Sequence, residues 1–187
     1  MSANCATREV YTVQVDSVCS SFPAGTSNAQ FQVTLPIPLR NVVKAELLMA
    51  SLHPSNNTYV ATHLYVEELV SNFNTRATLN YTIRGSNSAT TSTGPAATAL
   101  PVNAGYLERS FTVIPMDTSA FLNGVPSRFV WTCGNSFPTD VEYINPIRQL
   151  KTLTVTLYDK DGAVQTMNGS TFLTWRFECA KDNVCLY

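Results

Sequence analysis

The feature that most constrains this chain is a pair of alternating segments within residues 149–179. Apolar residues occupy every second position in two runs, Leu153, Val155 and Leu157, and then Leu173, Trp175 and Phe177. A period of two predicts strands with one buried face. Between the runs lie Asp159 and Gly162, and a glycine there supplies the positive φ that a tight turn needs. We therefore expect a β-ribbon with one apolar side, which the rest of the chain covers.

The same alternation recurs along the chain. It predicts further strands at residues 7–16, 31–35, 41–52, 59–70, 75–84, 107–114 and 128–132. Residues 41–52 also contain good helix formers. Because Lys44 and Glu46 alternate with the apolar Val43, Ala45, Leu47 and Met49, the strand is favoured there.

Prolines and polar runs predict the boundaries of these strands. Pro36 and Pro38 cannot donate to a ladder, so we expect them to end the second strand. Residues 137–146 are expected to be partly irregular. Residues 85–105 are a low-complexity Ser, Thr, Ala and Asn run, which predicts a long exposed loop.

Eight to ten strands without a long helix indicate an all-β fold, a sandwich or a barrel. Long strands joined by long variable loops favour a Greek-key jelly roll over a meander. The length suits one domain over residues 1–187, with an N-terminal arm at 1–6 and a C-terminal tail at 181–187.

Composition excludes several classes of function. Only 13% of the residues are charged and the net charge is −1, which argues against a nucleic-acid binder and suits self-association. We expect no signal peptide and no membrane span, since no apolar run approaches ~18 residues.

The five cysteines show no CxxC spacing, so reduced thiols in an intracellular compartment are favoured over disulfides. Without a secretory signal, the glycosylation sequons at Asn56, Asn80 and Asn168 are discounted.

No catalytic, cofactor or metal site is predicted, and we expect no enzyme. The two histidines, His53 and His63, form no His-x-His pair, and His63 is interpreted as a core residue. The Asp159–Gly162 stretch lacks the later acidic ligand of a calcium loop and is interpreted as turn chemistry. Cys179 and Cys185 are interpreted as ordinary thiols, although a pair or a metal site stays open. Trp131 and Trp175 are expected to be core or interface anchors rather than sugar platforms.

Two segments resemble a known family. Residues 31–47 (FQVTLPIPLRNVVKAEL) and residues 150–177, with LTVTLYDKDG followed by TFLTWRF, are similar to the opening strands and closing ribbon of single jelly-roll penton proteins. These come from large eukaryotic double-stranded DNA viruses and their virophage relatives. The resemblance implies a single eight-stranded jelly roll, a Greek-key β-sandwich. It also implies a homopentamer at the icosahedral fivefold vertex of the virion, assembled inside the host cell. Its implied partners are a double jelly-roll major capsid protein and minor capsid proteins, and it carries no catalytic residues.

Two alternatives stay open beside this expectation. A β-sandwich module that binds carbohydrate or protein would show an exposed aromatic cluster on one sheet face. Another minor capsid or cement protein with a jelly roll would share the fold without the pentamer.

Overall fold

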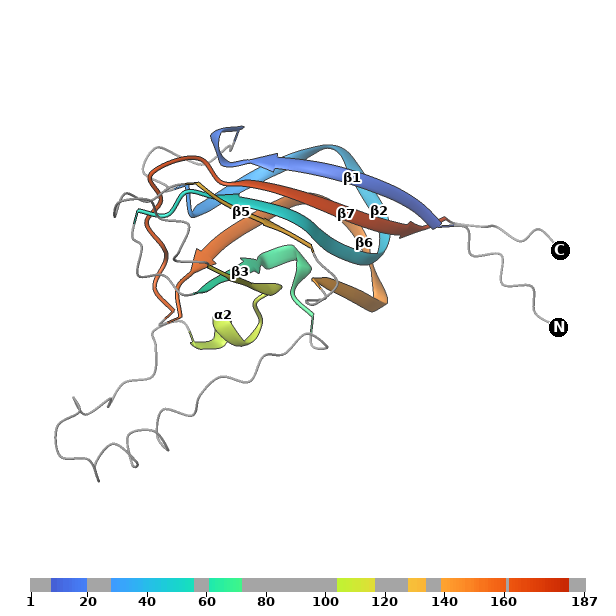
Figure 1. Ribbon diagram of the computed structural model, residues 1–187. Helices are drawn as coiled ribbons and strands as arrows, with labels where there is room; N and C mark the ends of the chain where they lie inside the picture. Colours follow the sequence, from blue (N-terminus) through green and yellow to red (C-terminus); the bar gives the residue numbers. More distant parts are fainter. Residues whose placement is uncertain are drawn as a thin grey trace, which may run out of the picture.

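The computed structural model describes residues 8–19, 28–55, 61–71, 104–116, 128–133, 139–160 and 162–181. The elements are β1 (Arg8–Asp16), η1 (Ser17–Cys19), β2 (Gln30–Leu52), β3 (Ala61–Val66), η2 (Glu67–Leu69), α2 (Ala104–Glu108), β4 (Thr112–Pro115), β5 (Phe129–Thr132), β6 (Asp140–Tyr158) and β7 (Phe172–Ala180). The strands form one curled antiparallel sheet, consistent with a β-sandwich (Figure 1). The predicted all-β class is confirmed.

The sheet is built on the pairing of its two longest strands, β2 and β6. Residues 30–34 of β2 pair with residues 152–156 of β6, and residues 39–46 pair with residues 140–150. The strand order is β1-β7-β2-β6-β3-β4, with β5 also paired to β2. The β2–β6 pair therefore runs through the whole sheet.

A bulge in β2 explains how this strand passes two prolines. Four of its residues, 35–38, lie opposite the single residue Lys151 of β6. Pro36 and Pro38 fall within this bulge, where no ladder hydrogen bond needs their missing N–H groups. The prediction that they end the strand is wrong, because β2 continues to Leu52.

A second bulge lies on β6. Its residues 143–146, which include Pro146, lie opposite the single residue Val43 of β2. The prediction that residues 137–146 are partly irregular agrees with this bulge, although β6 already begins at Asp140. Since a bulge bends its strand, the two bulges together let both long strands turn from one half of the sheet into the other.

The predicted strand over residues 41–52 is confirmed, but its buried face is not the one that strict alternation indicates. Ala45 and Leu47 are fully buried, whereas Val43 and Met49 are only half-buried. Two register shifts lie within the segment on its β7 side, between Val42 and Lys44 and between Leu47 and Met49. Each shift changes which residues face inward, because the side-chain period is two.

The predicted ribbon between the last two long strands is not formed, because β2 lies between β6 and β7. The turn itself is confirmed. Gly162 has a φ of 81°, and its N–H donates to the Asp159 carbonyl at 3.1 Å. After Val164 bridges back to Tyr158, the chain leaves β6 and reaches the far side of β2.

The two halves of the sheet enclose one core. The fully buried residues include Leu153, Val155 and Leu157 of β6 and Leu173, Trp175 and Phe177 of β7, as the alternation predicts. Phe111, just before β4, meets Trp175 with ring centroids 4.9 Å apart. This contact joins the half that carries β3 and β4 to the half that carries β7 and β1. In Figure 1, β3 and α2 lie beneath the long strands.

Two other predicted strands differ from the structure. Residues 107–114 begin as the end of helix α2, and β4 starts only at Thr112. The Ser110 N–H and hydroxyl both bond the Leu107 carbonyl and close this turn. The strand predicted at 59–70 ends at Val66, where η2 follows.

Several expectations fall outside the described residues. These are the strand at 75–84, the arm at 1–6, and all of the loop at 85–105 except residues 104–105, which begin α2. Of the tail at 181–187, only Lys181 is described.

Asn41 allows a test of the backbone near the bulges, because it has a φ of 51°. We expect Asn41→Val to be less stable than Asn41→Gly by about 1–2 kcal/mol, since a β-branched residue is strained in this left-handed region and glycine is not. Both variants lose the same amide, so their difference isolates the backbone. Urea unfolding measures it, and equal midpoints would contradict the assignment.

Candidate interaction surface

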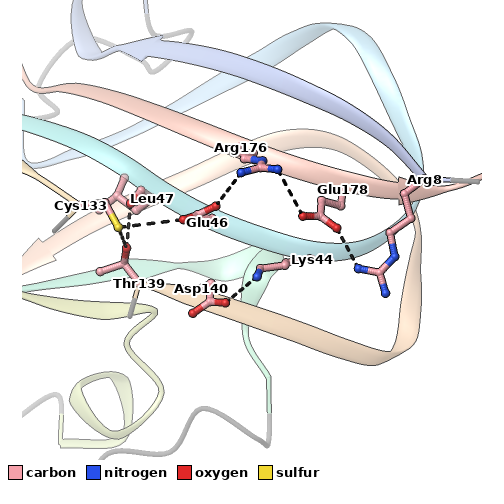
Figure 2. A network of polar contacts seen from close by, with 9 residues as sticks. All are labelled: Arg8, Lys44, Glu46, Leu47, Cys133, Thr139, Asp140, Arg176 and Glu178. Carbon is pink, nitrogen blue, oxygen red and sulfur yellow. Dashed lines mark hydrogen bonds and ion pairs between the residues drawn. The ribbon is translucent and has the colours of Figure 1, made fainter. Parts of the chain in front are cut away.

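The outward face of β1, β7, β2 and β6 carries a concentration of charged side chains. Because Phe177 and Ala45 point into the core, their neighbours Arg176, Glu178 and Lys44 point outward. The charged face is defined here as Arg8, Lys44, Glu46, Asp140, Arg176 and Glu178 (Figure 2).

Ion pairs link these side chains across all four strands. Arg8 Nη1 lies 2.8 Å from Glu178 Oε2. Arg176 lies between two carboxylates, 3.7 Å from Glu178 and 3.8 Å from Glu46. Lys44 Nζ lies 2.7 Å from Asp140 Oδ2. Figure 2 shows the first three contacts as one chain from Arg8 to Glu46.

The Cys133 thiol extends this chain at one end. Its sulfur lies 3.5 Å from Thr139 Oγ1 and 4.0 Å from Glu46 Oε1. The Thr139 hydroxyl has one proton, which it donates to the Leu47 carbonyl at 2.8 Å. The Cys133 S–H group likewise has one proton, which it donates to Glu46 Oε1.

The charged face contributes little to stability and instead gives the surface a pattern. The Asp140 hydrogen bond raises the pKa of Lys44, and the Glu178 hydrogen bond raises the pKa of Arg8. Both cations therefore stay charged at neutral pH. Exposed pairs of this kind contribute little to stability, because solvent screens the attraction and the long side chains lose conformational freedom. The charged face therefore presents positive and negative side chains in alternation, at positions fixed by their ion pairs.

The outward face of the other half of the sheet carries mainly uncharged polar side chains. On this face, one carboxylate binds η2 to β6. Glu68 of η2 accepts hydrogen bonds from the Thr154 backbone N–H at 2.7 Å and from the hydroxyls of Thr152 and Thr154 at 3.0 and 2.7 Å. β3 pairs with β6 only as far as Val66 opposite Val155. The carboxylate thus replaces the missing strand beyond that point.

Sequence reasoning missed Glu68. It stands beside Glu67 in the chain, and no local pattern separates the two. Glu68 has a structural role only because β3 stops pairing with β6 beside it, which leaves groups of β6 for its carboxylate to bind.

Three tyrosines from separate elements form an aromatic cluster on this second face. The Tyr106 ring of α2 stacks on Tyr158 of β6 at 5.7 Å and meets Tyr65 of β3 edge-on at 5.1 Å. Tyr158 is buried, whereas Tyr106 remains 45% exposed. Burial raises the pKa of Tyr65 and Tyr158, so both remain neutral phenols. The cluster offers one exposed ring on a rigid base.

A small cavity of about 210 Å³ lies where the start of β1 meets the bend of β2 and the end of β7. Its lining includes Glu9, Tyr11, Arg40, Cys179 and Lys181. The Tyr11 hydroxyl donates to Glu9 at 2.7 Å, and Lys181 lies 3.4 Å from the same carboxylate. Burial raises the pKa of the Cys179 thiol, which keeps it protonated and a poor nucleophile.

The structure places the histidines and tryptophans singled out from the sequence as follows. His53 follows β2, and its ring packs on Gly169, where an added Cβ would lie 2.6 Å from Nδ1. His63 is half-buried on β3, outside the core in which it was expected. Trp131 and Trp175 are buried, which confirms them as core anchors. Within the described ranges, no group of three or more His, Cys, Asp or Glu side chains is arranged to hold a metal ion.

The structure also places the predicted turn, the cysteines and the glycosylation sequons. Asp159 accepts a hydrogen bond from the Ala163 N–H at 2.9 Å, which agrees with turn chemistry. Cys133 and Cys179 are free thiols. Asn168 lies exposed in the turn before β7, whereas Asn56, Asn80 and Cys185 are outside the described residues.

The sequence matches no protein-family model and no curated protein. In the part of the chain that is described, no helix has the length and apolar character of a membrane span.

Glu68→Ala should lower the free energy of unfolding by about 2–3 kcal/mol, because it leaves the Thr154 N–H without its charged acceptor. The matched control is Glu67→Ala, an exposed neighbour that should change stability by less than about 0.5 kcal/mol. Chemical denaturation of both variants measures the difference. Equal effects would show that the carboxylate does not hold η2 to β6.

Proposed function

We propose that this chain is a structural capsid protein, and not an enzyme, that forms a homopentamer at the fivefold vertices of an icosahedral virion. Its neighbours in the shell are a double jelly-roll major capsid protein and minor capsid proteins. The fold that we propose for it is a single eight-stranded jelly roll.

The strand order carries this proposal. Divided at their bulges, β2 and β6 contribute two strands each, which makes eight with β1, β3, β4 and β7, while the short β5 is an addition beside β2. The pairing then follows β1-β7-β2-β6 in one half and β2-β6-β3-β4 in the other. This order supports the proposed jelly roll, an architecture of viral capsid domains, lectins and cupins.

The resemblance to penton proteins favours a capsid role among these. Residues 31–47 lie within β2, and residues 150–177 include the second half of β6, the turn and most of β7. The similar segments therefore cover large parts of the strands on which the sheet is built. A fivefold ring also needs two different contact surfaces on each copy, and a net charge of −1 keeps repulsion between copies small.

We expect the purified protein to give a species of five 20.5 kDa chains in native mass spectrometry. Light scattering across a concentration series provides an independent mass. A trimer would contradict the vertex assignment and favour a trimeric capsid or binding protein. A chain that stays monomeric at every concentration would also count against it.

The tyrosine cluster favours a second candidate function, a β-sandwich module that binds carbohydrate. The exposed Tyr106 ring, supported from beneath by Tyr65 and Tyr158, has the apolar face that sugars stack upon. Lectins share the jelly-roll architecture.

Under this second function, a glycan array would retain the protein, and Tyr106→Ala would weaken binding about tenfold, as loss of an aromatic contact of about 1–1.5 kcal/mol implies. Tyr11→Ala, an exposed tyrosine on β1, is the matched control and should leave binding unchanged. The absence of any retained glycan would contradict the binding function.

A further inference from the structure

The half of the sheet that contains β1 and β7 has two edges that no other described strand pairs with. β1 pairs with β7 along all nine of its residues, and no described strand pairs with its other side. At the opposite edge lie residues 140–147 of β6 and, in line with them, β5. Both pair with β2 on the side away from β7, and no described strand pairs with their outer sides. An exposed edge of this length is a template for pairing with another chain.

Exposed apolar side chains gather on these two edges. Val10 is 53% exposed and lies beside the exposed Tyr11 on β1. On the other edge, Ile144 of β6 is 73% exposed and Val130 of β5 is 56% exposed. These four are half of the eight large hydrophobic residues that the described surface exposes. Both edges therefore have apolar area to bury.

The charges are complementary between the two edges. In one cross-strand row, Glu178 of β7 lies opposite Lys44 of β2, which lies opposite Glu142 of β6. Arg8 of β1 reaches Glu178 diagonally, and the Glu142 carboxylate of the same copy also contributes to the raised pKa of Arg8. From β1 to β6 the signs alternate as positive, negative, positive and negative. The row thus begins with a base on one edge and ends with an acid on the other, so it continues if the edges of two copies meet.

Strand direction is also compatible with this contact. The four strands are antiparallel in sequence, so β1 and β6 run in opposite directions. Rotation about an axis parallel to the strands brings β6 of one copy beside β1 of the next in antiparallel orientation. Such a head-to-tail contact uses two different surfaces, which is the kind that closes rings.

We propose that the β6 and β5 edge of one copy docks on the β1 edge of the next copy, with Glu142 beside Arg8 of that copy. The occupant of each edge is a second copy of this chain. The inference rests on the proposed function, since it names the contact that joins subunits in the pentamer.

Disulfide trapping tests the contact with the full chain. We expect a 1:1 mixture of Val10→Cys and Glu142→Cys proteins to give a cross-linked dimer, whereas each variant alone gives none beyond the wild type with its own five cysteines. The double variant should give a ladder that ends at five chains. Cross-linking of Val10→Cys with itself would indicate a two-fold β1 contact and overturn the inference.

The outcomes separate this inference from the proposed function. A wild-type pentamer without cross-links in the mixture overturns the edge contact and leaves the pentamer standing. Cross-linked rings of another size support the contact and overturn the pentamer. A monomer without cross-links overturns both.

Charge reversal provides a second measurement. Glu142→Lys places like charges at the contact and should raise the dissociation constant for assembly at least about tenfold. Glu67→Lys makes the same change on η2, away from both edges, and should leave assembly unchanged. Equal effects of the two variants would overturn the proposed pairing.

Discussion

The antiparallel pairing of β2 with β6 is the interaction on which the rest of the structure depends. It extends along both strands and is interrupted by two bulges of opposite sense, one on each strand. Every other strand joins the sheet through this pair, with β3 and β4 on one half and β7, β1 and β5 on the other. Because each half has one apolar face, bending the pair is what lets those faces bury one another. Full burial of a side chain such as Leu153 or Leu173 contributes about 1.5–3 kcal/mol.

The alternation of apolar and polar residues that builds the core also places the polar side chains on the outward faces of the sheet. On one outward face, the charged side chains of β7, β2 and β6 form ion pairs between neighbouring strands and, for Arg176 and Glu178, within β7. On the other, threonines and Gln32 are organised around Glu68. Charged residues are depleted at the cores of interfaces, so the paired charges suit a wet face or the rim of a contact. Among the described strands, the outer sides of β1, β5 and β6 pair with no further strand and carry exposed apolar side chains, so we favour these edges as the docking surface.

Local periodicity predicted which side chains of β6 and β7 are buried, and the turn at Gly162, because both depend on residues close in the chain. It did not predict that β2 separates these two strands. Strands that are consecutive in the sequence often pair with each other, but they do not always do so. The prolines led to a wrong prediction of where β2 ends, for a related reason. A proline excludes a ladder hydrogen bond, but only the partner strand decides whether one is required there.

The sequence by itself determined the all-β class, the burial of residues such as Trp175, and the absence of a recognisable catalytic motif. These follow from the period of two and from side-chain chemistry, which are local properties. Only the tertiary structure decided which strands are neighbours, where the bulges fall, and which of Glu67 and Glu68 is structural. It also brought Arg8 and Glu178, which are 170 positions apart, into one ion pair. Such pairings depend on how the long strands bend, and no short stretch of sequence encodes that geometry alone.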